Sequence, residues 1–344
     1  MVGLKWFAAV ASVISCAACS SSDETPSKIN TEVESVIIVG TSVTKQIYID
    51  GGYGLTLLPK DAQGKVLLGQ GLTVNITIDR PDGFTSVVRD TDCSEPPDDS
   101  GLSVGVIIDD SGSMSSSDPD LKRKDAAVAF LDTLSDDDEV LLTDYGATGS
   151  NLRDLVCAAA SASADCLPSS AGFTDDKAAL LAAVEGITAS GGTPLYASCR
   201  QMVPLVAARK GRKQAILLLS DGQPSDSSLK ADCHAAAQAA GIPIFTVGLG
   251  PAAENETNSL ASAVTVLREI ATETSAAYAS ANDPKELTAL FTAVAEALTQ
   301  GKCDSNALLN EYSKLTVGTR VTGTVSVGDK QAKGTFEFVA PAKN

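Results

Sequence analysis

The period of hydrophobic and polar positions changes along the chain and divides it into three regions. Between residues 30 and 92, short β-branched runs alternate with turns rich in Gly and Asp, which predicts strands at VESVIIV, KQIYI, YGLTLLP and LTVNITI. Residues 313–344 return to this pattern, with KLTVGTRVTGTVSV, a turn and GTFEFVA. A polar, proline-containing segment at 90–101 indicates a linker.

Residues 102–300 alternate short apolar runs with segments of helical periodicity. Strands are predicted at SVGVIID, EVLLTDY, QAILLLSDG and IPIFTVGLG, and helices at DLKRKDAAVAFLDTL, SLKADCHAAAQAAG and DPKELTALFTAVAEALT. Continuous apolar strands between helices predict a parallel sheet covered on both faces. We therefore expect an α/β, doubly wound, Rossmann-like domain with a smaller all-β domain. His234 lies on one of these helices, and we expect it at the surface.

The N-terminus has the features of an export signal. A short basic start precedes an apolar run at residues 6–14, which is too short to span a bilayer and has the length of a signal-peptide core. No later stretch reaches about 18 apolar residues, so no transmembrane helix is predicted.

Small residues lead into cysteine twice, at Cys16 and Cys19, and both sites resemble the lipobox of bacterial lipoproteins. Cleavage before Cys19 removes Cys16 and leaves an even number of further cysteines for disulfides, whereas cleavage before Cys16 leaves an odd number. Parity therefore favours Cys19 as the lipid attachment site, with Cys16 as the alternative. An ordinary secretory signal without lipid is a third interpretation.

Composition removes several classes of function. Asp plus Glu is 43 and Lys plus Arg is 26, so the formal charge is −17. This acidity argues against a nucleic-acid partner, because binding phosphates requires a basic face. A single histidine, His234, excludes zinc sites built on several histidines and leaves few candidates for a general base.

Side chains that could bind a metal ion lie on three loops. Asp109, Ser111 and Ser113 alternate directly after the first apolar strand, Thr193 lies on a loop flanked by glycines, and Asp221 follows the strand at 215–219. In a doubly wound sheet, ligands bind beyond the carboxyl ends of the strands. Oxygen ligands without sulfur or imidazole select Mg²⁺, Mn²⁺ or Ca²⁺. The three loops therefore predict a site for a divalent cation.

The segments DDSGSM (109–114), GGTP (191–194) and LLLSDG (217–222) resemble the three motifs of the metal-ion-dependent adhesion site of the von Willebrand factor A domain. The resemblance implies that Ser111, Ser113 and Thr193 bind Mg²⁺, or Mn²⁺ or Ca²⁺, directly. It also implies that Asp109 and Asp221 act mostly through water. An Asp or Glu of a partner protein would then complete the coordination shell.

The resemblance also suggests how the remaining cysteines pair, although the sequence alone leaves fifteen pairings open. The two ends of an A domain lie close together, residues 157 and 166 share one insertion after residue 145, and residues 199 and 233 lie on two helices that flank the sheet. The expected pairs are Cys93–Cys303, Cys157–Cys166 and Cys199–Cys233.

These observations give an expected organisation. Two β segments flank the A domain, and they form either one immunoglobulin-like sandwich or two separate units, since a sandwich needs about seven strands. The expected segments are a signal peptide (1–18), a tether (19–29), a first sandwich segment (30–95), the A domain (101–302) and a second sandwich segment (304–344).

We therefore predict an exported, lipid-anchored protein of the bacterial cell envelope, at the outer membrane or cell surface, with the periplasm as the alternative. It would bind another protein through a divalent metal, by adhesion or complex assembly, and would not be an enzyme. The alternatives are a metal-dependent hydrolase and a structural envelope module whose metal only stabilises loops. The sequence does not identify the partner or the oligomeric state.

Overall fold

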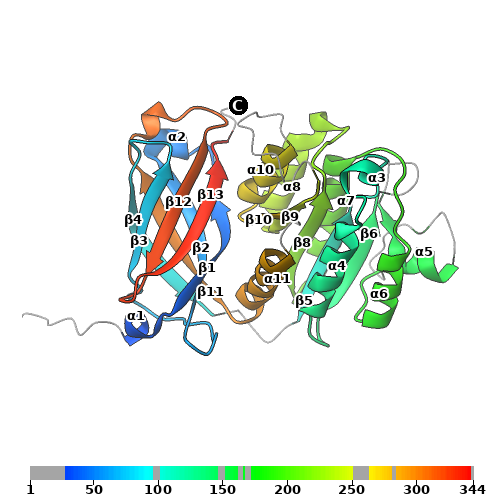
Figure 1. Ribbon diagram of the computed structural model, residues 1–344, viewed down its shortest axis with the longest axis horizontal. Coiled ribbons are helices and arrows are strands. Elements are labelled where there is room, and N and C mark those ends of the chain that lie inside the picture. Colours follow the sequence, from blue (N-terminus) through cyan, green and yellow to red (C-terminus); the bar gives the residue numbers. More distant parts are fainter. Residues whose placement is uncertain are drawn as a thin grey trace, which may run out of the picture.

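A computed structural model describes residues 28–95, 101–145, 152–161, 166, 172–250, 263–280 and 284–341. The expected signal peptide, both candidate lipid sites (Cys16 and Cys19) and most of the expected tether lie outside these residues. Within them, no helix is both long and apolar enough to cross a membrane. An all-β unit and an α/β unit lie side by side (Figure 1).

A six-stranded sheet in the order β10-β9-β8-β5-β6-β7 forms the centre of the α/β unit. All neighbouring strands are parallel except β7, which runs antiparallel to β6. Every residue of β5 is buried, as expected for a central strand with helices on both faces. The strands are β5 (Leu102–Ile108), β6 (Glu139–Asp144), β7 (Arg153–Asp154), β8 (Lys213–Ser220), β9 (Ile244–Gly248) and β10 (Tyr278–Ser280).

Helices cover both faces of this sheet (Figure 1). One hydrophobic core joins the sheet to α4 (Lys122–Asp132), α6 (Lys177–Glu185) and α11 (Pro284–Thr299). A second core on the opposite face joins it to α7 (Leu195–Ala207), α8 (Lys230–Ala240) and α10 (Ala263–Glu273). This arrangement confirms the predicted doubly wound fold. The shorter helices are α3 (Met114–Ser117), α5 (Leu155–Ser161) and the 3₁₀ turn η1 (Ser227–Leu229).

The all-β unit consists of two antiparallel sheets packed over a third hydrophobic core. Strands from before and after the α/β unit share both sheets, because β11 lies between β2 and β4 while β12 lies between β13 and β3. The strands are β1 (Ser35–Ser42), β2 (Gly52–Lys60), β3 (Val74–Arg80), β4 (Ser86–Ser94), β11 (Lys302–Leu309), β12 (Arg320–Val327) and β13 (Ala332–Val339). Short helical turns α1 (Lys28–Glu32), α2 (Ile47–Asp50) and η2 (Tyr312–Lys314) accompany them.

The two units meet where β1 and β13 face α10 and α11 (Figure 1). The backbone N–H of Thr41 donates to the carbonyl of Ala276 at 3.2 Å. Lys60 pairs with Glu296 on α11 at 2.5 Å, and Arg268 on α10 pairs with Glu337 on β13 at 2.8 Å. Polar contacts to α10, to α11 and to Ala276 after α10 therefore join the β unit to the α/β unit.

Three disulfides are present in the described residues, and they are the three pairs expected from the sequence. Cys93 on β4 and Cys303 on β11 face each other in register at the base of the β unit. The other two bridges lie within the α/β unit and are Cys157–Cys166 and Cys199–Cys233.

Some local predictions were wrong. The run KQIYI contains the helical turn α2 and not a strand, because the chain reverses at Gly51, whose φ of 81° suits glycine. The strand β4 extends to Ser94, into the expected linker. Its side chains are mostly polar and partly exposed at a sheet edge, so it carries little hydrophobic signal. Residues 313–319 form η2 and a turn, and β12 begins only at Arg320.

The expected surface position of His234 is also wrong. Only 8% of this residue is exposed, and its ring lies edge-on to Tyr196 at a centroid distance of 6.2 Å. The helix α8 turns this side chain towards the neighbouring helix α7, and alanines occupy much of the rest of α8. Alanine occurs on both the buried and the exposed faces of helices, so the hydrophobic periodicity of α8 did not predict that His234 is buried.

Candidate metal site

Asp109 directly follows β5 and is completely buried. Its Oδ1 accepts hydrogen bonds from the backbone N–H of Ser111 at 2.9 Å and from the Ser111 hydroxyl at 2.5 Å, and its Oδ2 accepts one from the Ser220 hydroxyl at 2.6 Å. Burial raises the pKa of Asp109, the charge of Asp221 raises it further, and the bonds from the two serines act in the opposite direction. The carboxylate is thus held in one orientation by donors from its own loop and from the end of β8.

Ser111 and Ser113 place their hydroxyls side by side. The two Oγ atoms are 3.0 Å apart, Ser111 is buried, and Ser113 is half-buried where α3 begins. The backbone turns at residues 111–113, where the N–H of Met114 donates to the carbonyl of Ser111 at 3.0 Å. This turn, and not the extended loop expected from the sequence, brings the two hydroxyls together.

Asp221 follows β8 and is also completely buried. Its Oδ2 accepts a hydrogen bond from the Ser117 hydroxyl at 2.9 Å. Its Oδ1 is buried and has no hydrogen-bond partner among the described residues. A buried carboxylate oxygen without a partner is costly, so this oxygen fits a bound cation or a water on that cation. The donor set, two carboxylates with hydroxyls, suits a hard divalent cation.

Thr193 lies on the loop between α6 and α7, which touches both other loops. The N–H of Gly112 donates to the carbonyl of Gly191 at 3.0 Å, and the N–H of Ser190 donates to the carbonyl of Asp110 at 2.5 Å. On the other side, the N–H of Ser225 donates to the carbonyl of Thr193 itself at 2.9 Å. The five expected site residues therefore lie on three loops that direct hydrogen bonds join at the carboxyl edge of the sheet.

Asp110 lies between the expected ligands in the sequence, but its buried side chain forms a hydrogen bond away from them. Its Oδ1 accepts a hydrogen bond from the backbone N–H of Tyr145 at 3.2 Å. Burial raises the pKa of Asp110, and the neighbouring charge of Asp144 raises it further. Arg153, on β7, forms an ion pair with Asp144 and partly offsets this repulsion. Asp110 thus connects the first loop to the end of β6.

Two serines that sequence reasoning did not assign to the site also hold its carboxylates. Ser220 donates to Asp109, and Ser117 donates to Asp221. A signal for Ser117 exists in its spacing, because it follows Ser113 by one helical turn. Ser220 immediately precedes Asp221, where the alternation of a strand turns it to the opposite side.

In the part of the chain that the structure describes, no three His, Cys, Asp or Glu side chains are grouped so that they could hold a metal ion. The site at the sheet edge contains two carboxylates, Asp109 and Asp221, and depends on neutral hydroxyls for the rest. Such a site leaves the charge of a divalent cation only partly compensated.

The fold and the site define a class, an α/β domain with a doubly wound sheet and an oxygen-only cluster at the carboxyl ends of its strands. The family model described as von Willebrand factor type A domain matches residues 103–293. The chain belongs to this family. The matched range contains all five expected site residues.

Solved structures with a related fold share little sequence with this chain. A von Willebrand factor type A protein from Catenulispora acidiphila is 14% identical, with a TM-score of 0.45, over 90% of this chain and 74% of that one. The vWF domain of the type V pili tip protein Mfa5 from Porphyromonas gingivalis is 14% identical, with a TM-score of 0.41, over 58% and 96%. The manganese-loaded TRAP protein of Plasmodium vivax is 16% identical, with a TM-score of 0.40, over 79% and 99%. No curated protein gives a significant match.

Proposed function

We propose that this chain binds a divalent cation at its three-loop site and uses that cation to hold an acidic side chain of another protein. The hydroxyls of Ser111, Ser113 and Thr193 would bind the cation directly, while Asp109 and Asp221 would orient its water. The bound cation, Mg²⁺ or alternatively Mn²⁺ or Ca²⁺, supplies a positive charge that neutral ligands compensate only in part. A carboxylate from a partner protein is the ligand that complements such a charge.

The observation that carries this proposal is the buried Oδ1 of Asp221, which lacks a hydrogen-bond partner among the described residues. The other oxygen of that carboxylate and both oxygens of Asp109 accept hydrogen bonds from serines. One buried acceptor therefore remains available on the loop after β8, which hydrogen bonds through the Thr193 loop connect to the paired hydroxyls of Ser111 and Ser113. This pattern matches a site prepared for a cation better than a purely structural hydrogen-bond network.

We further propose that the protein is exported and acts in the bacterial cell envelope, attached by a lipid on Cys19. Three disulfides support an oxidising compartment. The β unit, whose strands come from both sides of the α/β unit, would act as a single support that presents the metal site to a partner. Acyl labelling of the full chain in its host tests the anchor, because Cys19→Ala should abolish the label while Cys16→Ala should leave it.

Titration of the purified protein with Mg²⁺ and Mn²⁺ by calorimetry tests the metal site. Ser111→Ala and Asp221→Asn should each weaken binding by roughly 10- to 100-fold, the usual effect of altering ligands or the groups that orient them. Ser115→Ala is a matched control on α3, directly after the Ser111 loop, because the exposed hydroxyl of Ser115 donates to the carbonyl of Gly112 and not to a site residue. Equal affinities in all four proteins would refute the site.

Affinity capture from the native envelope tests the binding role. The protein should retain a partner in the presence of Mg²⁺ and release it on chelation, and Ser111→Ala should capture none while Ser115→Ala captures normally. Capture that survives both chelation and Ser111→Ala would contradict metal-dependent adhesion and would leave the metal with a role in loop structure only.

A further inference from the structure

The helix α7 begins at Leu195, two residues after Thr193, and its own chain neighbours cap it only in part. The residue at its N-cap is Pro194, which makes no side-chain capping hydrogen bond. The first N–H groups of a helix have no partner within the helix and need acceptors from elsewhere. The N–H of Leu195 donates to the carbonyl of Thr193 at 2.9 Å, so the N–H groups of Tyr196 and Ala197 are the ones that need acceptors from another part of the chain.

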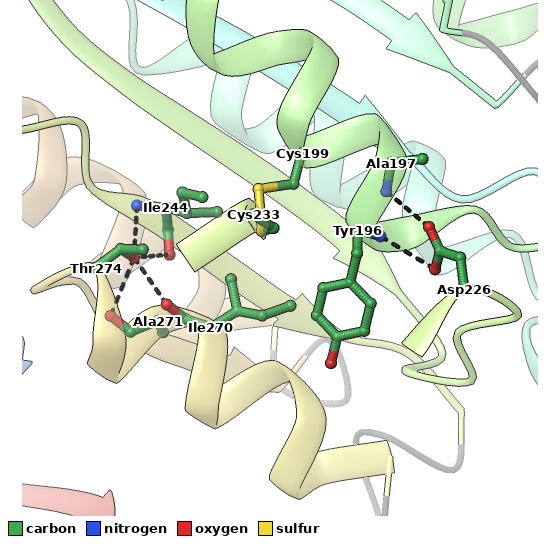
Figure 2. The surroundings of a disulfide bond; sticks show 9 residues. All are labelled: Tyr196, Ala197, Cys199, Asp226, Cys233, Ile244, Ile270, Ala271 and Thr274. Atoms are coloured by element: carbon green, nitrogen blue, oxygen red, sulfur yellow. Dashed lines mark hydrogen bonds between the residues drawn. A yellow bond between two sulfur atoms is a disulfide. The ribbon is translucent and has the colours of Figure 1, made fainter. Parts of the chain in front are cut away.

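Asp226 supplies these acceptors from the loop that carries Asp221. Its Oδ2 accepts a hydrogen bond from the N–H of Ala197 at 2.7 Å, and its Oδ1 accepts one from the N–H of Tyr196 at 3.3 Å (Figure 2). A negative carboxylate at a helix N-terminus is also favoured by the helix dipole. Asp226 thus closes the end of α7 next to Thr193.

Two further contacts keep the same loops together. The N–H of Ser225 donates to the carbonyl of Thr193 at 2.9 Å. One turn into α7, the buried Cys199 forms a disulfide with Cys233 on α8, the helix that follows the Asp221 loop (Figure 2). The loop of Thr193 and the loop of Asp221 are therefore connected at the site by Ser225 and Asp226, and behind it by a covalent bond.

We propose that Asp226 is a positioning residue of the cation site, which holds the Thr193 hydroxyl in register with Asp221 without touching the cation. This inference rests on the metal-binding part of the proposed function. Neutral hydroxyls are weak ligands individually, so the affinity of such a site depends on how well its loops are held in the binding geometry before the cation arrives. Asp226 joins two of the three loops that provide these ligands, so its loss lowers cation affinity.

Calorimetric titration of the full chain with Mn²⁺ and Mg²⁺ tests the proposal, and the melting temperature of the metal-free protein is measured in parallel. Asp226→Ala should weaken cation binding about tenfold or more, the range typical for residues that orient ligands. Asp226→Asn should have a smaller effect, because its amide keeps one acceptor oxygen of two. The matched control is Asp232→Asn, which removes an exposed ion pair with Arg200 (3.2 Å) between the same two helices, α7 and α8. It should leave the affinity unchanged.

A purely structural role for Asp226 predicts a different result. Asp226→Ala would then lower the melting temperature of the metal-free protein and leave the cation affinity unchanged, which would overturn the proposal. If Asp226→Ala does not fold, the cation affinity of Asp226→Asn is measured instead. An affinity equal to that of the wild type overturns the proposal. A wild-type protein that binds neither cation overturns the metal site and this inference together. The titration needs no partner protein, so a failure of the partner-binding proposal does not affect its result.

Discussion

Removal of the Cys93–Cys303 disulfide should reveal how strongly the two units of this protein depend on each other. The two cysteines face each other on the paired strands β4 and β11. The chain enters the α/β unit after β4 and returns from it at β11. The double variant Cys93→Ala/Cys303→Ala opens this connection and introduces no polar atom at the buried Cys303 position.

The expected loss depends on which part of the chain unfolds. The bridge spans 210 residues, so if both units unfold together, the chain-entropy relation gives a loss of about 5 kcal/mol in the free energy of unfolding. The two bridges enclosed within this loop shorten it too little to change that figure. If the β unit unfolds while the α/β unit stays folded, only the short connections at 94–102 and 299–303 close the loop. The loss then falls to about 3 kcal/mol.

Guanidinium unfolding, followed by circular dichroism, measures this loss against the wild type. The matched control is Cys157→Ala/Cys166→Ala, whose bridge spans only 9 residues and should contribute about 2.5 kcal/mol by the same relation. The larger loss is therefore expected for the longer bridge. A loss below about 1 kcal/mol for Cys93→Ala/Cys303→Ala, or a larger loss for the control, would refute the loop-entropy reasoning.

Two further predictions concern single side chains. Gly40→Ala places a Cβ 2.7 Å from the backbone carbonyl oxygen of Ser275 at the contact between the units. It should cost about 1–3 kcal/mol in thermal or chemical unfolding, whereas Gly54→Ala on the adjacent strand meets nothing nearer than 3.5 Å and should be tolerated. Equal effects would contradict the tight contact. Burial, with the charge of Lys230, lowers the pKa of His234 from its ordinary 6.5 to about 4. The contribution of neutral His234 to stability is therefore complete above pH 6.5 and is lost as the pH falls towards 4, by about 3 kcal/mol. His234→Gln should flatten the stability measured by urea unfolding across this window, and an unchanged slope would show that His234 is not its source.

The α/β unit could be predicted from the sequence because its strands are buried on both faces. Runs such as VGVII and AILLL carry a strong apolar signal, and segments of helical length lie between them. The polar edge strand β4 and the mixed strand β11 carry no such signal, since what defines them is their pairing with each other. The turn α2 was missed because β-branched and aromatic residues also occur in short helical turns packed against a core.

The candidate site, like the fold, could be predicted from the sequence only in part. Asp109, Ser111, Ser113 and Asp221 follow β5 and β8, whose carboxyl ends lie side by side in a parallel sheet, so topology alone places these four near each other. Thr193 lies on the loop between α6 and α7, and its motif predicted its place in the site. Ser117, Ser220 and Asp226 act through contacts between loops that are distant in sequence. Ser117 reaches Asp221 across 104 residues, and Ser220 reaches Asp109 across 111. The spacing of Ser117 from Ser113 indicates that Ser117 lies near the site, but no local pattern encodes which distant carboxylate each serine contacts.

The position of β11 between β2 and β4 has a consequence for how the chain assembles. During synthesis from the N-terminus, β1, β2 and β4 emerge first, but their sheet lacks the strand β11 until the whole α/β unit has followed. Until then β2 and β4 have open edges that can pair with other chains. The α/β unit has all its own strands earlier, and by folding it brings the ends of β4 and β11 together, which removes most of the loop-closure cost. The inserted unit thereby acts as an internal folding aid for the unit that surrounds it.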